Sequence, residues 1–270
     1  MRRSWLFVPG ADEKAHAAAA RSGADVIILE LEDFTPPGLR GRARALAAKA
    51  FASWRAAGAL AAVRVNPLDG DGHDDLRGVL PAKPDVVMMS KVESPEQVRA
   101  LETAVPGKAE LVPNIESARA LVRIPEIAKS SSRITALLVA SEDMVADLGT
   151  ARSRGGEELA YVRARFLVEC RAAGVEAIDC PYTFGDAKGA GADARVAKRL
   201  GYRMKSLVDP SHARVINKAF TPDLARARKI VAAFEKARAQ GKDRAKVDGA
   251  LIEVPIYAAA KRLLASAGHS

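Results

Sequence analysis

Aromatic residues are scarce in this chain, and so are the side chains that usually mark nucleophilic or zinc sites. Only 5% of its 270 residues are aromatic, so we expect a core made mainly of Ala, Val, Ile and Leu. The two cysteines, Cys170 and Cys180, do not form a disulfide framework or a metal-binding spacing. No arrangement of the four histidines indicates a Ser–His–Asp or Cys–His site.

Long apolar runs are absent as well. No run approaches the roughly 20 residues that a membrane span requires. The apolar run near the N-terminus, residues 5–8, is too short for the core of a signal peptide. We therefore expect a soluble, cytoplasmic protein that does not associate with membranes.

The net charge is +9, from 42 basic and 33 acidic residues. A polyanionic partner, either nucleic acid or a phosphorylated ligand, is one interpretation of this excess. However, the basic residues are dispersed, and no stripe of base-stacking aromatic residues accompanies them. We therefore interpret most of the charge as solvated helix faces and expect no binding of nucleic acid.

Short apolar runs alternate with Ala-rich amphipathic stretches along the chain. This alternation predicts parallel strands that are buried on both faces. Eight strands with intervening helices favour an α/β fold, a (β/α)₈ TIM barrel over residues 1–220. A doubly wound open sheet is the alternative, but no Gly-rich phosphate fingerprint follows an early strand. The expected strands are 5–8, 25–32, 60–66, 85–90, 110–116, 134–143, 175–180 and 205–209. The expected helices are 12–22, 41–57, 94–105, 117–129, 157–173 and 187–200, with a weaker candidate at 71–80.

Residues 221–270 follow a different pattern and are expected to form a short helical C-terminal extension. Thr221 and Pro222 are plausible as the N-cap and first position of a helix that runs to residue 240. A polar break at 241–246 precedes a segment, 247–265, that ends in a second helix.

Ionisable residues stand at the end of nearly every predicted strand. The carboxyl ends of barrel strands form the active site in this fold. Converging carboxylates are costly unless paired, and a hard divalent cation such as Mg²⁺ resolves the repulsion. Singly, each acid also has a structural interpretation: Glu30 or Glu32 as a buried partner of a cation, or Asp143 as a helix cap. The residues concerned are Glu30, Glu32, Asp33, Arg64, Lys91, Glu93, Glu116, Glu142, Asp143, Asp179 and Asp209.

Several motifs occur in a fixed order: RSWLFVPG, ILELEDFTPP, VRVNPLDG, SKVESPEQV, PNIESARAL, ASEDMVADLG and AIDCPYT. With them, the chain resembles the HpcH/HpaI aldolase/citrate lyase superfamily. Within it, the match is to the citrate lyase β-subunit branch, which includes malyl-CoA and citramalyl-CoA lyases. The resemblance extends from Arg3 to about Ala265.

This resemblance implies a TIM barrel that assembles as a homotrimer or hexamer and carries Mg²⁺ at the rim. By position in the motifs, Glu116 and Asp143 are the implied metal ligands. Arg64 is the implied catalytic and substrate-binding arginine. The other residues implied to contact the substrate, or to lie near the metal and its waters, are Glu32, Asp33, Arg40 and Lys205.

The implied reaction is cleavage of a 3-hydroxyacyl-CoA of the citryl, malyl or citramalyl type into acetyl-CoA and a 2-oxo acid. The metal acts as a Lewis acid on the oxo-acid carbonyl. The departing thioester enolate needs a fixed positive donor, for which Arg64 is the candidate. A carboxyl group must also exchange a proton with the enolate carbon.

The chain departs from the family pattern at several of these positions. Glu253 stands where relatives carry the catalytic Asp, and the extra methylene can displace the proton by roughly 1 Å, an error that can cost about 10²-fold in rate. Asp209 replaces a His, and Arg40 replaces a Lys with a different donor geometry. Three alternatives stay open: an aldolase acting on free 2-oxo acids without CoA, an acyl-CoA thioesterase, and, because of Glu253, a catalytically weakened binding or regulatory subunit. Nucleic-acid binding is a fourth alternative, which the dispersed charge disfavours.

Overall fold

The computed structural model describes residues 2–267, which form two compact units. The first unit spans Arg2–Phe220 and the second begins at Thr221. No helix in the described range is long and apolar enough to cross a membrane.

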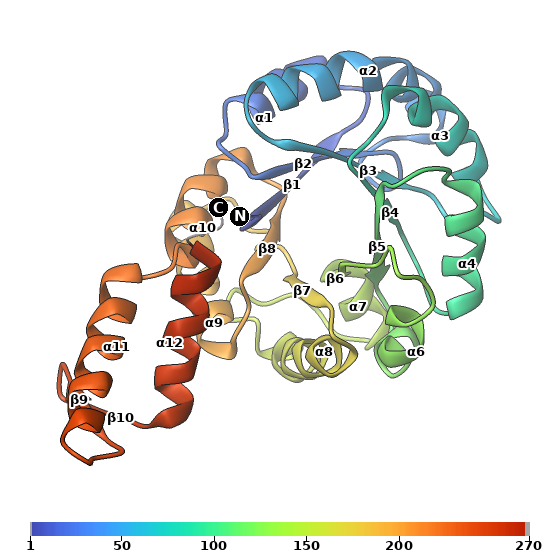
Figure 1. Cartoon of the computed structure of the whole chain (residues 1–270). Helices are drawn as coiled ribbons and strands as arrows, with labels where there is room; N and C mark the ends of the chain where they lie inside the picture. The colour runs from blue at the N-terminus through green and yellow to red at the C-terminus, as the bar shows by residue number, and fades with distance from the viewer. Residues whose placement is uncertain (1, 268–270) are drawn as a thin grey trace. The chain divides into compact units, whose positions relative to one another are not determined.

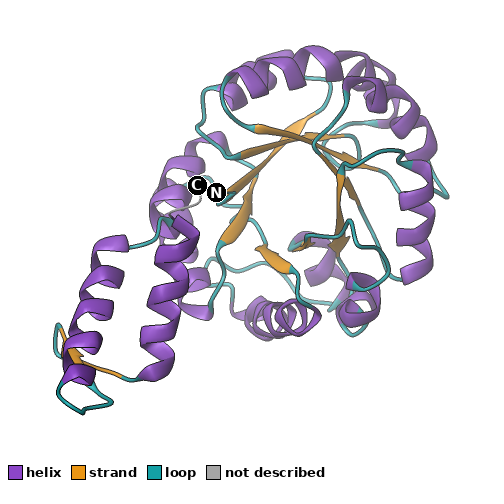
Figure 2. Cartoon of the chain, viewed as in Figure 1, coloured by secondary structure: helices purple, strands orange, loops and turns teal. Residues whose placement is uncertain are grey.

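The first unit is a closed barrel of eight parallel strands surrounded by helices (Figure 1, Figure 2). Each strand pairs with the next along the chain, and β1 closes the barrel by pairing with β8. The predicted TIM barrel is confirmed. The strands are β1 (Ser4–Pro9), β2 (Val26–Glu30), β3 (Leu60–Val65), β4 (Val86–Met89), β5 (Glu110–Ile115), β6 (Ala136–Val139), β7 (Glu176–Asp179) and β8 (Met204–Leu207).

All but the last of the helices of this unit lie between successive strands, as the alternating pattern predicted, and the last follows β8. The helices at 142–147 and 213–220 were not predicted. They are α1 (Glu13–Ala20), α2 (Arg40–Ala56), α3 (Gly72–Val79), α4 (Pro95–Ala104), α5 (Ala118–Leu121), α6 (Ile124–Ala128), α7 (Glu142–Asp147), α8 (Ala160–Ala173), α9 (Ala187–Leu200) and α10 (Ala213–Phe220). Short 3₁₀ turns occur at Pro37–Leu39, Leu80–Ala82, Glu157–Leu159 and Pro210–His212.

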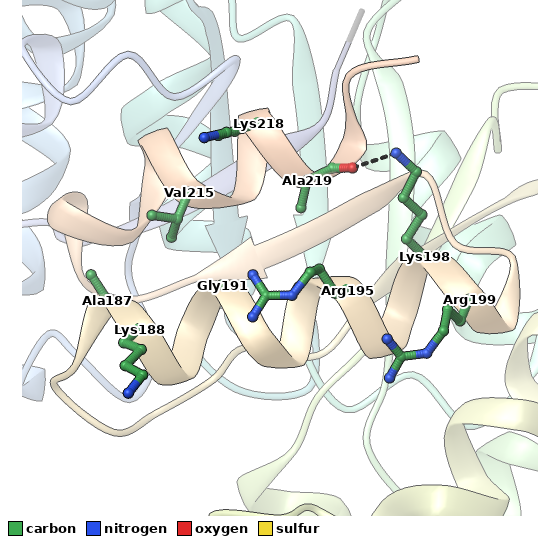
Figure 3. Close-up of a pocket in the computed structure, with 9 residues that line it drawn as sticks. All are labelled: Ala187, Lys188, Gly191, Arg195, Lys198, Arg199, Val215, Lys218 and Ala219. Carbon is green, nitrogen blue, oxygen red and sulfur yellow. Dashed lines mark hydrogen bonds between the residues drawn. The ribbon is translucent and has the colours of Figure 1, made fainter. Parts of the chain in front are cut away.

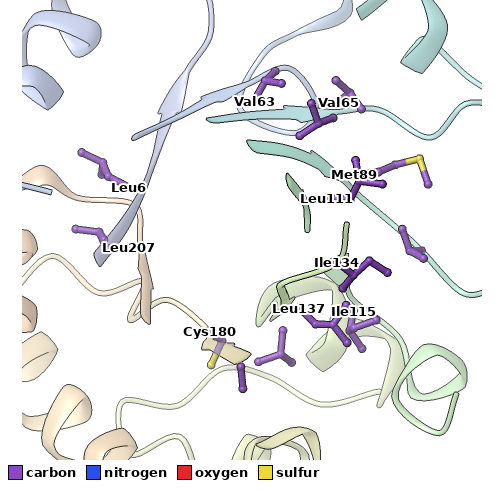
Figure 4. Packing of buried hydrophobic residues seen from close by; sticks show 14 of the residues in the cluster. Leu6, Val63, Val65, Met89, Leu111, Ile115, Ile134, Leu137, Cys180 and Leu207 are labelled. Carbon is purple, nitrogen blue, oxygen red and sulfur yellow. The ribbon is translucent and has the colours of Figure 1, made fainter. Parts of the chain in front are cut away.

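The strands bury both of their faces. Side chains such as Leu6, Met89 and Leu207 point from the strands toward the helices (Figure 4). A separate cluster that includes Trp5 and Met88 fills the barrel interior. Burial on both faces explains why the strand sequences are continuously apolar rather than alternating.

Two expected elements differ most from the observed ones. β6 ends at Val139, and the expected strand through residue 143 is wrong because Ser141 begins a helical turn that continues as α7. The expected helix 117–129 is divided into α5 and α6. Pro125 lies in the first turn of α6. Proline lacks an N–H and clashes with the carbonyl four residues earlier, so a continuous helix cannot pass through it.

The second unit is a helical hairpin with its own small core. It contains α11 (Leu224–Ala239), an antiparallel pair β9 (Ala245–Val247) and β10 (Ala250–Ile252), and α12 (Val254–Ala267). Phe234 of α11 stacks on Tyr257 of α12 with ring centroids 4.6 Å apart. The predicted N-cap of α11, Thr221, is wrong by two positions. Asp223 caps the helix, and its side chain accepts from the Arg226 N–H at 2.8 Å.

The β9–β10 hairpin was not predicted, although the sequence contains its signal. Asp248 and Gly249 occupy the two-residue turn with φ of 49° and 80°. An Asp-Gly pair with both residues in the left-handed region is typical of the tight hairpin turn.

Candidate active site at the carboxyl ends of the strands

Arg64 lies at the centre of a cluster of carboxylates. It is the fifth residue of β3 and only 5% exposed. Its guanidinium lies over the ring of Phe7, 4.9 Å from the centroid. Burial disfavours its charge, but the carboxylates of Glu30, Glu116 and Glu32 outweigh this effect and raise the pKa of Arg64. The arginine is therefore a fixed cation in a site shielded from water.

The acids of the ILELED segment surround this cation. Glu30 ends β2 and is fully buried, with Oε1 2.9 Å from Arg64 Nη2. Glu32 follows in the loop after β2, and its Oε2 lies 3.1 Å from the same nitrogen. Asp33 is half exposed, and its Oδ2 lies 3.9 Å away. The structure thus brings together Arg64, Glu30, Glu32 and Asp33, as expected for neighbouring parallel strands.

Lys91 is the second cation of the cluster. It follows β4 in a left-handed conformation with φ of 53°, which is uncommon for a residue with a side chain. Its Nζ lies 2.5 Å from Glu32 Oε1, and this contact is the main reason that the pKa of Lys91 is raised. Glu32 is therefore held between Lys91 and Arg64.

Glu116 and Asp143 line one small hollow at the ends of β5 and β6, of about 280 Å³. Both carboxylate oxygens of Glu116 are buried without a hydrogen-bond donor. Burial raises the pKa of Glu116 to about 8, opposed by the Arg64 charge and reinforced by Asp143 and Glu32. Asp143 is the second residue of α7, and Ser141 occupies the N-cap position, so Asp143 is not the helix cap. A buried carboxylate with unused oxygens, facing a second acid, fits a cation ligand.

The donor set fits Mg²⁺ with open positions. Within residues 2–267 no group of three or more His, Cys, Asp and Glu side chains forms a complete metal cage. Mg²⁺ is usually held by one or two carboxylates together with waters and substrate oxygens. Five carboxylates and two cations leave the cluster with a formal charge of −3, which a divalent cation would partly offset. The carboxylates are Glu30, Glu32, Asp33, Glu116 and Asp143, and the cations are Arg64 and Lys91.

Sequence comparison identifies the family. The model of the HpcH/HpaI aldolase/citrate lyase family matches residues 3–210. This chain belongs to that family. Citrate lyase subunit beta from Haemophilus influenzae is 33% identical over 279 residues, which cover 98% of this chain and 96% of that protein. A (3S)-malyl-CoA thioesterase from Cereibacter sphaeroides is 31% identical over 271 residues, covering 98% and 94%.

Solved structures agree with this assignment. The protein CitE from Mycobacterium tuberculosis, in complex with magnesium, acetoacetate and coenzyme A, superposes with a TM-score of 0.78. It is 28% identical, and the match covers 98% of each chain. The likeness to this structure therefore extends over almost the whole chain.

Two expected substrate-binding residues lie apart from the Arg64 cluster. Lys205 is fully buried, and its ammonium is paired with Asp179 at 2.7 Å and Asp193 at 2.5 Å. Asp179 and Asp193 therefore neutralise the charge of Lys205, and its implied role in substrate binding stays a prediction. Arg40 begins α2 and forms an ion pair of 2.6 Å with Asp71.

The two substituted family positions have local roles in this structure. Asp209 caps the turn after β8 by accepting from the Ser211 N–H at 2.8 Å. Glu253 belongs to the C-terminal unit, where it immediately precedes α12. Its half-exposed carboxylate lies 3.7 Å from Arg244 Nε.

Sequence reasoning missed three residues of the rim. Phe7 lies under Arg64, and Asp147 lines the hollow of Glu116. Asn114 is fully buried on β5, and its side chain interacts with Glu116 in a way that lowers the pKa of that carboxyl. Asp147 had a usable signal, because it follows Asp143 by one helical turn. Phe7 and Asn114 looked like ordinary members of a strand.

A larger hollow of about 690 Å³ lies outside the rim, between α9 and α10 (Figure 3). Its floor consists of small or apolar residues, and its edges carry Lys188, Arg195, Lys198, Arg199 and Lys218. All five cations are exposed to solvent, and no carboxylate lines the hollow. This face accounts for part of the basic excess. None of its charges is buried, so it has no feature that defines a binding site.

Proposed function

We propose that this protein is a Mg²⁺-dependent carbon–carbon lyase. Its substrate would be a 3-hydroxyacyl-CoA of the citryl, malyl or citramalyl type, cleaved into acetyl-CoA and a 2-oxo acid. The observation that carries the proposal is the buried Arg64 guanidinium beside the paired acids Glu116 and Asp143. Support also comes from the citrate lyase β-subunit relatives and from the CitE complex with magnesium, acetoacetate and coenzyme A.

In this proposal Glu116 and Asp143 hold the cation. When bound, Mg²⁺ acts as a Lewis acid that polarises the carbonyl oxygen of the 2-oxo acid. Arg64 supplies a preorganised positive donor for the enolate oxygen that develops on the acetyl group. Such a donor is effective because it is fixed in a site of low dielectric. Glu32 and Asp33 would accept hydrogen bonds from water in the outer coordination sphere.

The proton that the enolate carbon needs is assigned to Glu253. Three apolar side chains close to it in sequence, Leu251, Val254 and Ile256, are each more than 40% exposed. Exposed apolar side chains grouped together are typical of a surface that is covered on association. We therefore propose a homo-oligomer, a trimer or hexamer, in which this surface is buried. Arg40 is proposed to contact a CoA phosphate when the substrate binds, and its ion pair with Asp71 would then break.

We also propose a cytoplasmic location. Support comes from Cys170 and Cys180, which are both buried free thiols. Free thiols persist in a reducing compartment.

The test is product analysis with purified protein, Mg²⁺ and a panel of citramalyl-, malyl- and citryl-thioesters. A lyase releases acetyl-CoA and the 2-oxo acid together. A thioesterase, favoured by the malyl-CoA thioesterase relative, releases free CoA and the intact hydroxy acid. Cleavage of free hydroxy acids without a thioester would favour the aldolase. Failure to turn over any of these substrates with Mg²⁺ bound would contradict the proposal and favour a binding subunit.

A further inference from the structure

We infer that Glu30 is a positioning residue: it fixes which edge of the Arg64 guanidinium faces the ligand. This inference rests on the proposed role of Arg64 and adds a residue to it. Glu30 is distinct from the metal ligands, and nothing in its surroundings leaves it a free oxygen for substrate.

The carboxylate of Glu30 uses both oxygens. Oε1 accepts from Arg64 Nε at 2.9 Å and from the backbone N–H of Glu32 at 2.7 Å. Oε2 accepts from the backbone N–H of Phe34 at 2.7 Å. All three donors therefore converge on a single, fully buried carboxylate.

These contacts occupy one edge of the guanidinium. Nε and Nη2 both lie 2.9 Å from Glu30 Oε1, while Nη2 also reaches Glu32. Nη1 forms no hydrogen bond within the described part of the chain and lies 3.6 Å from Glu116 Oε1. The planar fork of arginine is rigid, so fixing the Nε–Nη2 edge also fixes the direction of the two Nη1 hydrogens. Nη1 is thereby aimed toward the carboxylate proposed to hold the metal.

Glu30 also organises the loop that carries the outer acids, through its carboxylate and its backbone carbonyl. Residues 32 and 34 donate to Glu30 through their backbone, and the Thr35 hydroxyl donates to the Glu30 carbonyl at 2.5 Å. The position of Glu32 and the direction of Arg64 are therefore set by one residue.

Only a carboxylate satisfies this arrangement. Glutamine has one acceptor oxygen and one donor amide, and it would face N–H donors on both sides. If its oxygen takes the Oε1 position, its amide meets the Phe34 N–H. In the flipped state the amide meets Arg64 and the Glu32 N–H. Either way a buried donor is left unpaired beside another donor, which is strongly unfavourable.

The experiment compares Glu30→Gln with Asp25→Asn as a matched control. Asp25 also pairs with an arginine, Arg3, at 2.9 Å, but it lies just before β2, at the opposite end of the strand from Glu30. Both changes remove a carboxylate–guanidinium pair and are expected to lower stability. Only Glu30→Gln should alter catalysis, lowering kcat about 10²-fold with KM nearly unchanged, because the donor acts on charge that develops in the transition state.

A double-mutant cycle separates positioning from a general loss of structure. In an Arg64→Ala background, Glu30→Gln should change kcat by less than about 10-fold, because its effect through Arg64 is gone and only its effect on the Glu32 loop remains. A full additional loss of about 10²-fold in that background would overturn the inference. Glu30→Asp keeps the charge but is too short to reach both Arg64 and the loop. Its kcat should lie between those of the wild type and Glu30→Gln. If the glutamine variant does not fold, Glu30→Asp replaces it in the comparison.

A second readout does not depend on turnover. The Nε–H resonance of Arg64, assigned by its loss in Arg64→Lys, should exchange slowly with solvent in the wild type. Exchange should be at least about 10-fold faster in Glu30→Gln and unchanged in Asp25→Asn. An unaltered resonance in Glu30→Gln would overturn the inference even if the wild type proved to have no lyase activity. Absence of lyase activity with the expected change in exchange would instead contradict only the proposed function.

Discussion

Arg64 Nη1 lies 3.6 Å from Glu116 Oε1, which places the buried cation of β3 beside the buried acid that follows β5. In the metal-free chain this contact partly compensates an otherwise isolated carboxylate. If Glu116 holds the cation, as proposed, Nη1 would become available to a ligand. The contact would then link metal binding to the donor that the proposed chemistry requires.

Glu116→Gln should abolish the stabilisation that Mg²⁺ confers. The amide keeps the volume of the side chain but removes the charge that holds the ion. Thermal unfolding with and without about 5–10 mM Mg²⁺ measures the effect. This concentration is chosen to saturate a site of modest affinity. The wild type should gain in melting temperature and the variant should not. An equal gain in both would place the ion elsewhere.

Mg²⁺ affinity should rise with pH up to about 8. The pKa of Glu116 is raised to about 8 in the metal-free chain, so below that pH the ion must displace a proton. Affinity should then change by up to ~10-fold per pH unit below 8 and level off above it. Calorimetric titrations at several pH values, in buffers of different ionisation enthalpy, report both the affinity and the released proton.

The stability of the metal-free protein should show the opposite trend. The pKa of Glu116 is higher in the folded chain than its ordinary value of 4.5. The folded state therefore binds this proton more tightly, and the resulting stability is complete below pH 4.5 and is lost as pH rises through 8. Chemical unfolding of wild type and Glu116→Gln isolates the contribution, because the difference between them should change in this window. A difference independent of pH would contradict the assigned pKa.

Arg64→Lys should lower kcat by about 10²- to 10³-fold. Lysine keeps the positive charge, but a single ammonium cannot bind Glu30 along one edge and present two hydrogens along another. It also loses the stacking on Phe7. Steady-state kinetics checks this expectation. A variant with nearly full turnover would show that only the charge of Arg64 matters.

Glu253→Gln should remove turnover while leaving Mg²⁺ and 2-oxo acid binding unchanged. The amide has no exchangeable acidic proton for the enolate carbon. Glu253→Asp is the companion variant. A turnover rate below that of the wild type would show that the site is adapted to glutamate, and a higher rate would indicate that the wild type is a weakened catalyst. Binding of pyruvate with Mg²⁺, measured by calorimetry, is the control for both variants.

The barrel was predictable because its pattern is repeated eight times, and each strand is apolar on both faces. The rim acids followed from topology, since parallel strands bring their carboxyl ends together. Other features depend on tertiary contacts that no local pattern reports. The strand that carries Lys205 was recognised, but the pairing of its ammonium with Asp179 and Asp193 was not. Likewise, the sequence around Phe7 is that of an ordinary strand, and only the structure shows that Arg64 lies over its ring.

The central claim is most directly tested by diffraction from crystals grown with Mn²⁺, as an anomalous substitute for Mg²⁺, and pyruvate. The account predicts one anomalous peak bound by Glu116 and Asp143, with pyruvate oxygens completing the coordination and Arg64 Nη1 facing the same hollow. A fully occupied Mn²⁺ site away from this pair, or none at saturating Mn²⁺, would contradict it.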